Sequence, residues 1–357
     1  MNPFLSEIAQ HFTNQQILQI KPLGNGLIND TYRVNTRQSD FVLQRINQHV
    51  FQCPEKILDN LLHLQQHLNN KPNNAVRLKL PNIIQTTDGQ HSLRDYEDQS
   101  WRALEFITRS ESRESLSNRT EAAQVGLALG HFHSLFSDLD THLLVDTLPG
   151  FHVTPYYFQA YLEACTLASA FMQDDEYQYC QDFIQQQQYR VDSLEIARQQ
   201  GLLKERVIHG DPKLNNFLFA CDSDEIISLI DLDTVKPGLI HYDIGDCLRS
   251  SCHIHDSNRF DLELADIILQ NYFQEAGKMM TQADYDFLYD AIWLIPFELG
   301  LRFFTDYLQG NRYFKTNEPR HNLKRAIAQF ELCDDIEKQK PKLLGMMATL
   351  SSPNTVT

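Results

Sequence analysis

The sequence predicts an α+β fold with two lobes, a small strand-rich N-terminal lobe and a larger, mainly helical C-terminal lobe. Short runs of β-branched and aromatic residues, separated by turn residues, recur up to about residue 107. Helical periodicity dominates afterwards, as from Val125 to Phe136, where apolar residues recur every three or four positions. The third observation is a polar loop between two apolar runs at 207–219. We therefore expect strand-rich sequence to give way to mainly helical sequence near residue 107.

Composition narrows the function classes. The chain has 357 residues, of which 42% are hydrophobic, enough for substantial cores. With 47 acidic and 31 basic residues its net charge is −16, which argues against a nucleic-acid partner, because such an interface needs clustered basic residues. Seven cysteines without a C-x-x-C pair predict reduced thiols. Because no secretory signal or membrane-spanning apolar run is present, we expect a cytoplasmic protein with no membrane partner.

The stretch at 207–219 concentrates the polar residues that chemistry requires. Apolar pairs flank a His-Gly-Asp-Pro-Lys-Leu-Asn-Asn segment, so the polar residues lie on a tight loop between two buried strands. Asp211 is followed by Lys213 after two residues and by Asn216 after five. A further apolar strand then ends in the acidic residues Asp231 and Asp233, which would share one face of an extended strand.

These spacings resemble the catalytic and metal-binding segments of protein kinases. Gly210 and the Ile-Asp at 230–231 are similar to the aminoglycoside-phosphotransferase-like kinases. Within that group, His-x-Asp-x-Lys-Leu-Asn-Asn, Ile-Asp-Leu-Asp-Thr-Val-x-Pro-Gly and Tyr-Asp-Ile-Gly-Asp closely resemble bacterial N-acetylhexosamine 1-kinases. The resemblance extends from Gly24 to about Lys342 and implies a protein-kinase-like two-lobed fold.

The resemblance implies a role for each polar residue of the loop. Asp211 would accept or orient the proton of the attacking hydroxyl, and Lys213 would reach the transferring phosphate. Asn216 and Asp231 offer the oxygen ligands that Mg²⁺ prefers, with Asp233 as a further ligand or one acting through water. Because the net charge repels a nucleotide, Mg²⁺, basic side chains and backbone N–H groups must supply local positive potential.

Two residues near the loop are expected to be structural. His209 would brace the loop by hydrogen bonding rather than act as a base, and Asp243 would brace it from a helix start. Asp246 is expected to bind the substrate, with Arg249 facing it as well. Cys247, Cys252 and the nearby histidines do not complete a recognised zinc spacing, so we expect no metal there.

The N-terminal lobe is expected to hold ATP. A Gly-x-Gly between two strands can bring backbone N–H groups to phosphates, although the same pattern also fits an ordinary hairpin. No lysine occupies the strand at 41–46 where kinases place one; Gln44 and Arg45 are there instead, on opposite faces. By resemblance, the strand at 101–107 would be the hinge that pairs with adenine, which divides the chain into an N-terminal lobe over 1–107 and a C-terminal lobe over 108–357. The alternative is that it is simply a buried edge strand. The expected nucleotide-binding residues are Gly24, Asn25, Gly26, Asn29, Thr31, Gln44, Glu105 and Ile107.

The acceptor side is predicted from the last third of the chain. Glu298, Arg302 and Asp306 recur at i, i+4 and i+8, so they share one helix face. By resemblance, Arg302 and Tyr313 match sugar-contacting positions. Leu27 replaces the histidine that follows the Gly-x-Gly in hexosamine 1-kinases.

The sequence therefore predicts ATP- and Mg²⁺-dependent phosphorylation of a small hydroxylated molecule, specifically the anomeric hydroxyl of an N-acetylhexosamine-like sugar. An amino alcohol, homoserine or an aminoglycoside is the alternative acceptor. A nucleotide-binding pseudokinase is the alternative from another class. Nothing in the sequence indicates the oligomeric state.

Overall fold

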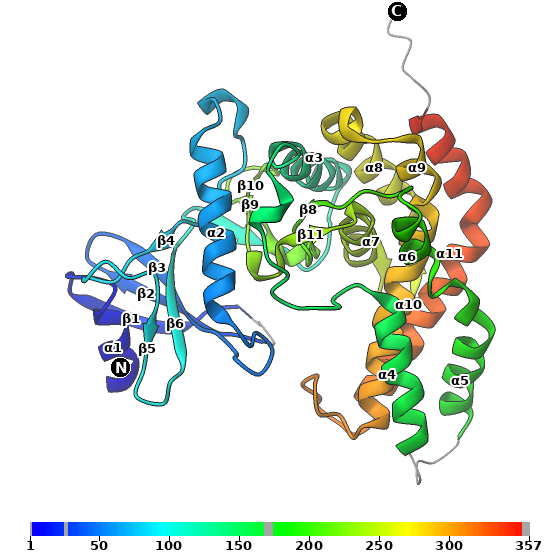
Figure 1. Cartoon of the computed structure of the whole chain (residues 1–357), viewed down its shortest axis with the longest axis horizontal. Coiled ribbons are helices and arrows are strands. Elements are labelled where there is room, and N and C mark those ends of the chain that lie inside the picture. Colours follow the sequence, from blue (N-terminus) through cyan, green and yellow to red (C-terminus); the bar gives the residue numbers. More distant parts are fainter. Residues whose placement is uncertain (1, 25–27, 168–173, 352–357) are drawn as a thin grey trace, which may run out of the picture.

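The small lobe is an antiparallel sheet in the order β1-β2-β3-β6-β4, with β5 also paired to β6 (Figure 1). The computed structural model describes residues 2–24, 28–167 and 174–351, so Asn25, Gly26 and Leu27 lie outside the described residues. The elements of this lobe are α1 (Pro3–Gln10), β1 (Ile17–Pro22), β2 (Asp30–Thr36), β3 (Asp40–Arg45), α2 (Pro54–Asn69), β4 (Ile83–Ile84), β5 (Leu93–Arg94) and β6 (Ser100–Glu105).

The two faces of this sheet differ in chemistry. One face packs α1 onto a small apolar core that includes Phe41, Leu43 and Trp101. On the opposite face, α2 stands between the sheet and the large lobe (Figure 1). The Asn60 side-chain amide of α2 donates to the carbonyls of Val145 and Val235 at 2.8 and 2.9 Å. The second face, which we call the interlobe face, is thus directed at the large lobe.

The described part of the large lobe combines three short sheets with helices. The sheets are β10-β9-β7, β11-β8 and β12-β13. In the helical layer α10 packs against both α7 and α11, and α11 lies on the outer side (Figure 1). Its elements are β7 (Ser110–Ser112), α3 (Arg119–Leu135), α4 (Thr154–Leu167), α5 (Asp175–Gln187), α6 (Ser193–Gln199), β8 (Arg206–Ile208), β9 (Phe217–Ala220), β10 (Ile226–Leu229), β11 (Lys236–Gly238), α7 (Ile240–Ser251), β12 (His253–Ile254), β13 (Arg259–Phe260), α8 (Leu262–Ala276), α9 (Gln282–Asp286), α10 (Leu288–Leu308) and α11 (His321–Ser351).

The predicted α+β fold with a small sheet lobe and a larger helical lobe is confirmed. Some local expectations were wrong. The sequence pattern predicts a single helix over 174–200, but a 3₁₀ turn at Gln188–Arg190 divides this range into α5 and α6. It also predicts a charged final helix over 333–342, whereas the last helix begins at His321 and ends at Ser351. Asp231 and Asp233 do not extend β10, since Asp231 has a left-handed backbone with φ of 65°.

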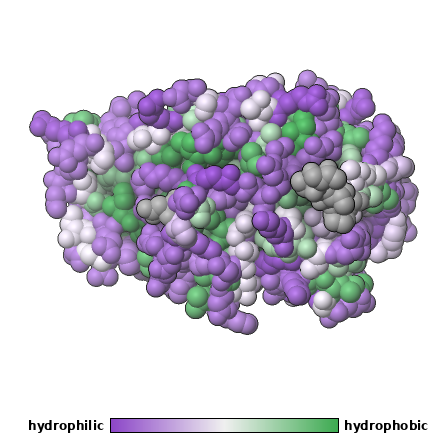
Figure 2. Space-filling view, turned by 90° about the horizontal axis from the view of Figure 1, so that it is seen from above, coloured by the Kyte–Doolittle hydropathy of each residue, from purple (hydrophilic) through white to green (hydrophobic). Residues whose placement is uncertain are grey.

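The surface is largely polar. In the face shown in Figure 2, hydrophilic residues predominate and apolar patches are small and interrupted, as expected from the composition. None of the helices in residues 2–24, 28–167 and 174–351 is long and apolar enough to cross a membrane.

Candidate active site

The polar loop leaves β8 and is held compact by its own side chains. Nζ of Lys213 donates to Oδ2 of Asp211 at 2.5 Å, and Nδ2 of Asn216 donates to the Asp211 carbonyl at 2.7 Å. The Leu214–Asn216 segment forms a 3₁₀ turn before β9 begins. The three loop residues that the sequence predicts to act in phosphate transfer, Asp211, Lys213 and Asn216, are therefore in direct contact.

Asp243 anchors the loop from the first turn of α7. Its fully buried carboxylate accepts from the backbone N–H groups of His209 at 2.7 Å and Gly210 at 2.9 Å. Nε2 of His133, on α3, lies 2.9 Å from the same carboxylate. Because both oxygens are used on the loop backbone, Asp243 has the arrangement expected of a structural residue.

His209 is positioned as a brace. Its Nδ1 accepts from the Asp211 backbone N–H at 3.3 Å, so Nε2 is the protonated nitrogen that donates to the Ile230 carbonyl at 3.0 Å. Burial lowers the pKa of this histidine, which favours the neutral ring. A neutral His209 with both nitrogens engaged connects the catalytic loop to the segment that carries Asp231.

Gly210 is required for the close approach of two loops. Its φ is +87°, a conformation that side chains rarely adopt, and a Cβ at this position would lie 2.5 Å from the Thr234 carbonyl oxygen. The Thr234 hydroxyl in turn donates to the His209 carbonyl at 3.0 Å. The loop at 207–219 and the loop after β10 therefore pack backbone to backbone.

Asp231 and Asp233 are in different environments. The Asp231 side chain is 41% exposed and its Oδ2 lies 4.0 Å from Nζ of Lys213. The Asp233 side chain is only 3% exposed, and its two oxygens accept from Arg102 and from Nδ2 of Asn29. Asp231 is thus open to a ligand, whereas Asp233 already holds a cation from the small lobe.

The oxygen donors of this region suit a hard cation. The Ile230 backbone N–H donates to the Asn216 carbonyl at 3.0 Å, which places Asn216 beside the start of the Asp231 loop. Loss of water around Asp231, followed by the nearby Asp233 and Asp211 carboxylates, raises the pKa of Asp231 to about 6 despite Lys213. In the described parts of the chain, no cluster of three His, Cys, Asp or Glu side chains could hold a metal. A Mg²⁺ here would therefore complete its shell with phosphate oxygens and water.

Two of the predicted nucleotide-binding residues, Thr31 and Gln44, lie in one row with Arg102 across the interlobe face. Thr31 of β2 lies opposite Gln44 of β3, and Gln44 lies opposite Arg102 of β6. Nε2 of Gln44 donates to the Thr31 hydroxyl at 3.1 Å, and its Oε1 accepts from Nη2 of Arg102 at 2.8 Å. Arg102 then pairs with Asp233. The row thereby connects the sheet to the Asp231 loop, and Gly24 at the start of the glycine segment has φ of +71°.

The predicted hinge residues lie at the end of β6. The Glu105 backbone N–H donates to the Asn82 carbonyl at 2.8 Å, and its carboxylate pairs with Lys79. The Ile107 side chain is buried and its carbonyl accepts from the Ser110 hydroxyl at 2.7 Å. Both residues thus occupy the connection between the lobes.

Arg302 is an unpaired cation beside the loop. Its guanidinium lies 5.2, 4.9 and 5.6 Å from the ring centroids of Phe151, Tyr157 and Phe314, and among the described residues it makes no hydrogen bond or ion pair. Although burial alone would lower the pKa of Arg302, charges that include Asp211 raise it. Tyr313 is exposed and packs against Phe314 at 4.8 Å.

The acidic side chains around Arg302 are committed to protein partners. Glu298 accepts from the Thr154 hydroxyl at 2.9 Å and lies 3.2 Å from Nδ1 of His152. The Asp306 carboxylate accepts from the backbone N–H groups of residues 312–314 and so anchors the loop that carries Tyr313. Oδ1 of Asp246 pairs with Arg249 at 2.8 Å, while its buried Oδ2 has no hydrogen-bond partner within the described part of the chain.

Comparison with known proteins decides the family. Residues 19–290 match the model of a phosphotransferase enzyme family. The chain belongs to this family. The match spans both predicted lobes and every candidate catalytic and metal-binding residue from Asp211 to Asp233. The protein is therefore a phosphotransferase, whereas a specific likeness to N-acetylhexosamine 1-kinases is not among these findings.

Solved structures share the fold of this phosphotransferase at low identity. An aminoglycoside phosphotransferase from Alicyclobacillus acidocaldarius is 15% identical with a TM-score of 0.66, over 97% of this chain and 96% of that one. An amicoumacin kinase, in complex with AMP-PNP and Ca²⁺, is 14% identical with a TM-score of 0.62, over 95% and 93%. A microcompartment-associated aminopropanol kinase is 14% identical with a TM-score of 0.60, over 96% and 98%. These likenesses establish the fold.

Two residues that contact the candidate site, Arg102 and His152, are not among those predicted from the sequence. The sequence does carry a signal for Arg102, because a charged residue between the apolar residues of a strand indicates a buried polar partner. His152 offered no such signal. Its Nε2 lies 2.7 Å from the Gly210 carbonyl and its Nδ1 faces Glu298, so it supports the loop from a segment about 60 residues away. Burial would lower the pKa of His152, but Glu298 and then Asp246 raise it overall.

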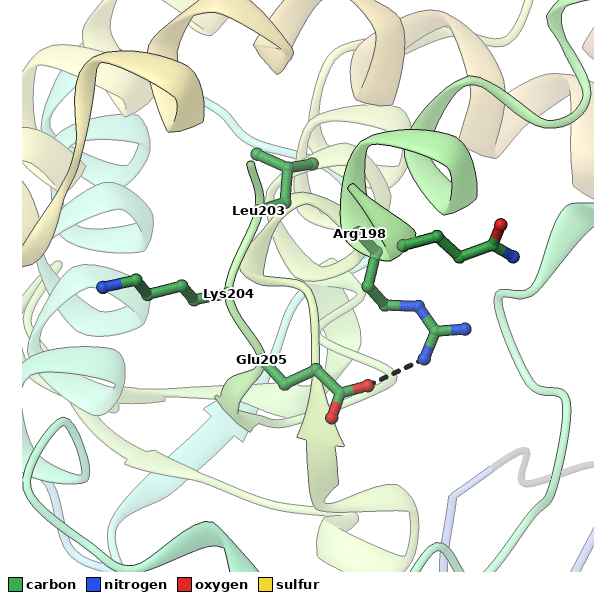
Figure 3. Close-up of a pocket in the computed structure, with 5 residues that line it drawn as sticks. Arg198, Leu203, Lys204 and Glu205 are labelled. Carbon is green, nitrogen blue, oxygen red and sulfur yellow. Dashed lines mark hydrogen bonds and ion pairs between the residues drawn. The ribbon is translucent and has the colours of Figure 1, made fainter. Parts of the chain in front are cut away.

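One surface hollow lies apart from the candidate site. It is lined by Arg198, Gln199, Leu203, Lys204 and Glu205, with Arg198 donating to Glu205 at 2.8 Å (Figure 3). These residues precede β8, whereas the catalytic loop leaves the other end of that strand. The hollow therefore lies at the wrong end of β8 for the chemistry.

Proposed function

We propose that this phosphotransferase moves the γ-phosphate of ATP to a sugar hydroxyl, at the anomeric position of an N-acetylhexosamine-like sugar. The observation that carries the sugar assignment is the unpaired Arg302 guanidinium beside Asp211, within three aromatic rings. Residues 1–107 would form the ATP-binding lobe and 108–357 the catalytic and acceptor-binding lobe. The choice of an N-acetylhexosamine rests on the motif resemblance from Gly24 to Lys342.

The proposed transfer uses few side chains. The acceptor O–H would lose its proton to the Asp211 carboxylate while its oxygen bonds to the γ-phosphorus, and the bond from that phosphorus to the ADP oxygen breaks. Lys213 would place positive charge on the transferring phosphate. Asn216 and Asp231 would hold Mg²⁺, which when bound neutralises phosphate charge. Asp233 would act on this centre indirectly, through Arg102.

The charges around Arg302 favour a neutral acceptor over a cationic one. The Glu298 carboxylate offsets part of the charge of Arg302, but its oxygens already contact His152 and Thr154, so it is not free to bind a cationic acceptor. The Asp306 carboxylate likewise accepts from loop backbone N–H groups. A cationic amine near an unpaired guanidinium would be repelled. A sugar could instead accept hydrogen bonds from Arg302 through its ring hydroxyls or an acetamido carbonyl, and could donate one to the free Oδ2 of Asp246.

An amino alcohol or aminoglycoside acceptor is the second candidate. It is favoured by the likeness to an aminoglycoside phosphotransferase and an aminopropanol kinase. That likeness is at 15% identity or below and concerns the fold, whereas the Arg302 environment belongs to this chain. We therefore prefer the sugar.

A panel assay tests the proposal. Purified protein with Mg²⁺ and ATP is given N-acetylhexosamines, other hexoses, amino alcohols and aminoglycosides, and acceptor-dependent ADP release is measured. Release with N-acetylhexosamines alone supports the proposal. Release only with cationic acceptors establishes the second candidate, and ATP binding without release from any acceptor indicates a pseudokinase.

A further inference from the structure

We propose that Arg102 of β6 supplies the nucleotide-phosphate cation that kinases usually place on β3, and that its free Nη1 contacts a phosphate of the bound nucleotide. This rests on the proposed use of ATP but not on the identity of the acceptor. The nucleotide-binding residues predicted from the sequence do not include Arg102. The sequence places no lysine on β3 and does not by itself show which residue takes its place.

The position of Arg102 follows from strand register. In the β3–β6 pair Arg102 lies directly opposite Gln44, and directly opposed residues of antiparallel strands share one face of a sheet. The neighbours Trp101 and Ala103 point to the other face, into the core under α1. A long side chain at Arg102 therefore crosses the interlobe face beside the place where a β3 lysine would stand.

The hydrogen bonding of Arg102 is incomplete in a way that calls for a ligand. The residue is 2% exposed. Nε and Nη2 are used by Gln44 and Asp233, while Nη1 is buried without a hydrogen-bond partner in the described part of the chain. Buried donors of this kind are rare, since most find a partner in protein, water or ligand. A phosphate oxygen is a strong acceptor for a guanidinium N–H.

The charges near Arg102 favour a bound cation beside the nucleotide. Arg102 and Lys213 face the carboxylates of Asp211, Asp231 and Asp233, which leaves one negative charge in excess, and Mg²⁺ would balance it. Asp233, which pairs with Arg102, lies two positions after Asp231, the proposed Mg²⁺ ligand. A nucleotide phosphate bound near Asp231 would hence lie within reach of both the cation and the metal.

Asp233 gains a defined part in this arrangement. Its Oδ1 holds Nη2 of Arg102, and its Oδ2 accepts from Nδ2 of Asn29 at 2.8 Å. Asn29 follows the glycine segment, and its Oδ1 accepts from the Asn47 backbone N–H at 3.0 Å. Asp233 thus orients the guanidinium from the large lobe, so that Arg102 can meet phosphate without a change of partner.

The test measures binding by isothermal titration calorimetry, which needs no acceptor and no turnover. ATP, ADP and adenosine are titrated with Mg²⁺, and ADP also in EDTA, into the wild-type protein and Arg102→Met. Loss of a charge-assisted contact should weaken ATP and ADP by about 10- to 100-fold, in EDTA as well, and leave adenosine within about twofold. The control is Arg45→Met, on the adjacent strand but the opposite face, where Arg45 pairs with Asp30; its nucleotide affinities should match wild type.

A second variant separates phosphate contact from a purely structural role. Arg102→Met leaves Asp233 buried and unpaired, whereas Arg102→Met with Asp233→Asn removes that charge. If the double variant regains wild-type affinity for ADP in EDTA, or if adenosine weakens as much as ATP, Arg102 only connects the lobes and the proposal is overturned. Absence of ATP binding by the wild-type protein would overturn it too. Failure of every sugar in the panel assay would leave this result standing, so the two proposals fail separately.

Discussion

Replacement of Asp243 by alanine should release the catalytic loop and destabilise the protein. Its carboxylate is fully buried and accepts from the backbone N–H groups of His209 and Gly210, and alanine would leave both donors unpaired. Each unsatisfied buried donor costs roughly 1 to 3 kcal/mol, so the expected loss is roughly 2 to 6 kcal/mol. Asp243→Asn retains one accepting oxygen and should lose about half as much.

Urea unfolding measures this loss in the free energy of unfolding. The variant and wild type should show the same dependence of free energy on urea concentration, so that their midpoints can be compared. Turnover of the folded Asp243→Ala fraction should fall as well, because Asp211 loses its fixed position. Asp256→Ala, at an exposed aspartate between β12 and β13, is the control and should change neither quantity. A stability within about 1 kcal/mol of wild type for Asp243→Ala would refute the anchoring role, because it would be below the cost of two unpaired donors.

Three further predictions follow from the site. Gly210→Ala should lose more stability and activity than Gly201→Ala. Both glycines have positive φ, but only at Gly210 would a Cβ meet another atom, the Thr234 carbonyl oxygen at 2.5 Å. Equal losses in urea unfolding would mean that backbone strain alone explains both, and that the close approach to Thr234 contributes nothing. Arg302→Met should raise the acceptor KM by about tenfold or more while the ATP KM is unchanged, since one hydrogen bond from a charged donor is worth about 1.5 to 3 kcal/mol; an unchanged acceptor KM in steady-state kinetics would exclude Arg302 from acceptor binding. The pKa of His152 is raised in the folded protein above about 6.5, so its proton stabilises the fold fully below that pH, and this contribution is lost as the pH rises through the folded pKa. His152→Asn should flatten that part of the pH profile of unfolding free energy above pH 6.5, and an unaltered profile would show that His152 does not titrate there.

Local contrast in the sequence was enough to locate the polar loop. The loop at 207–219 was predictable because apolar strands enclose its polar residues, and the structure brings Asp211, Lys213 and Asn216 into contact. Strand geometry alone predicts that Gln44 and Arg45 point to opposite faces of the sheet. The structure agrees, because Gln44 accepts from Arg102 on one face and Arg45 donates to Asp30 on the other.

Long-range pairing was beyond the sequence. Arg102 pairs with Asp233, which lies 131 positions later in the chain, and no local sequence pattern predicts that contact. The left-handed backbone of Asp231 depends on the packing of its loop against Gly210, so a simple extension of β10 was the natural but wrong expectation. Asp306 resembles a pocket charge on a helix face, yet its partners are backbone N–H groups of the following loop.

The central claim is that Asp211 serves as the base for phosphate transfer from ATP to a sugar. Phosphorus NMR of ATP, Mg²⁺ and an N-acetylhexosamine tests it most directly, with wild type compared to Asp211→Asn. Wild type should yield a sugar 1-phosphate signal equal in amount to ADP, and the variant should yield none while still binding ATP. Full turnover by Asp211→Asn, or no sugar phosphate from the wild-type protein, would contradict the account.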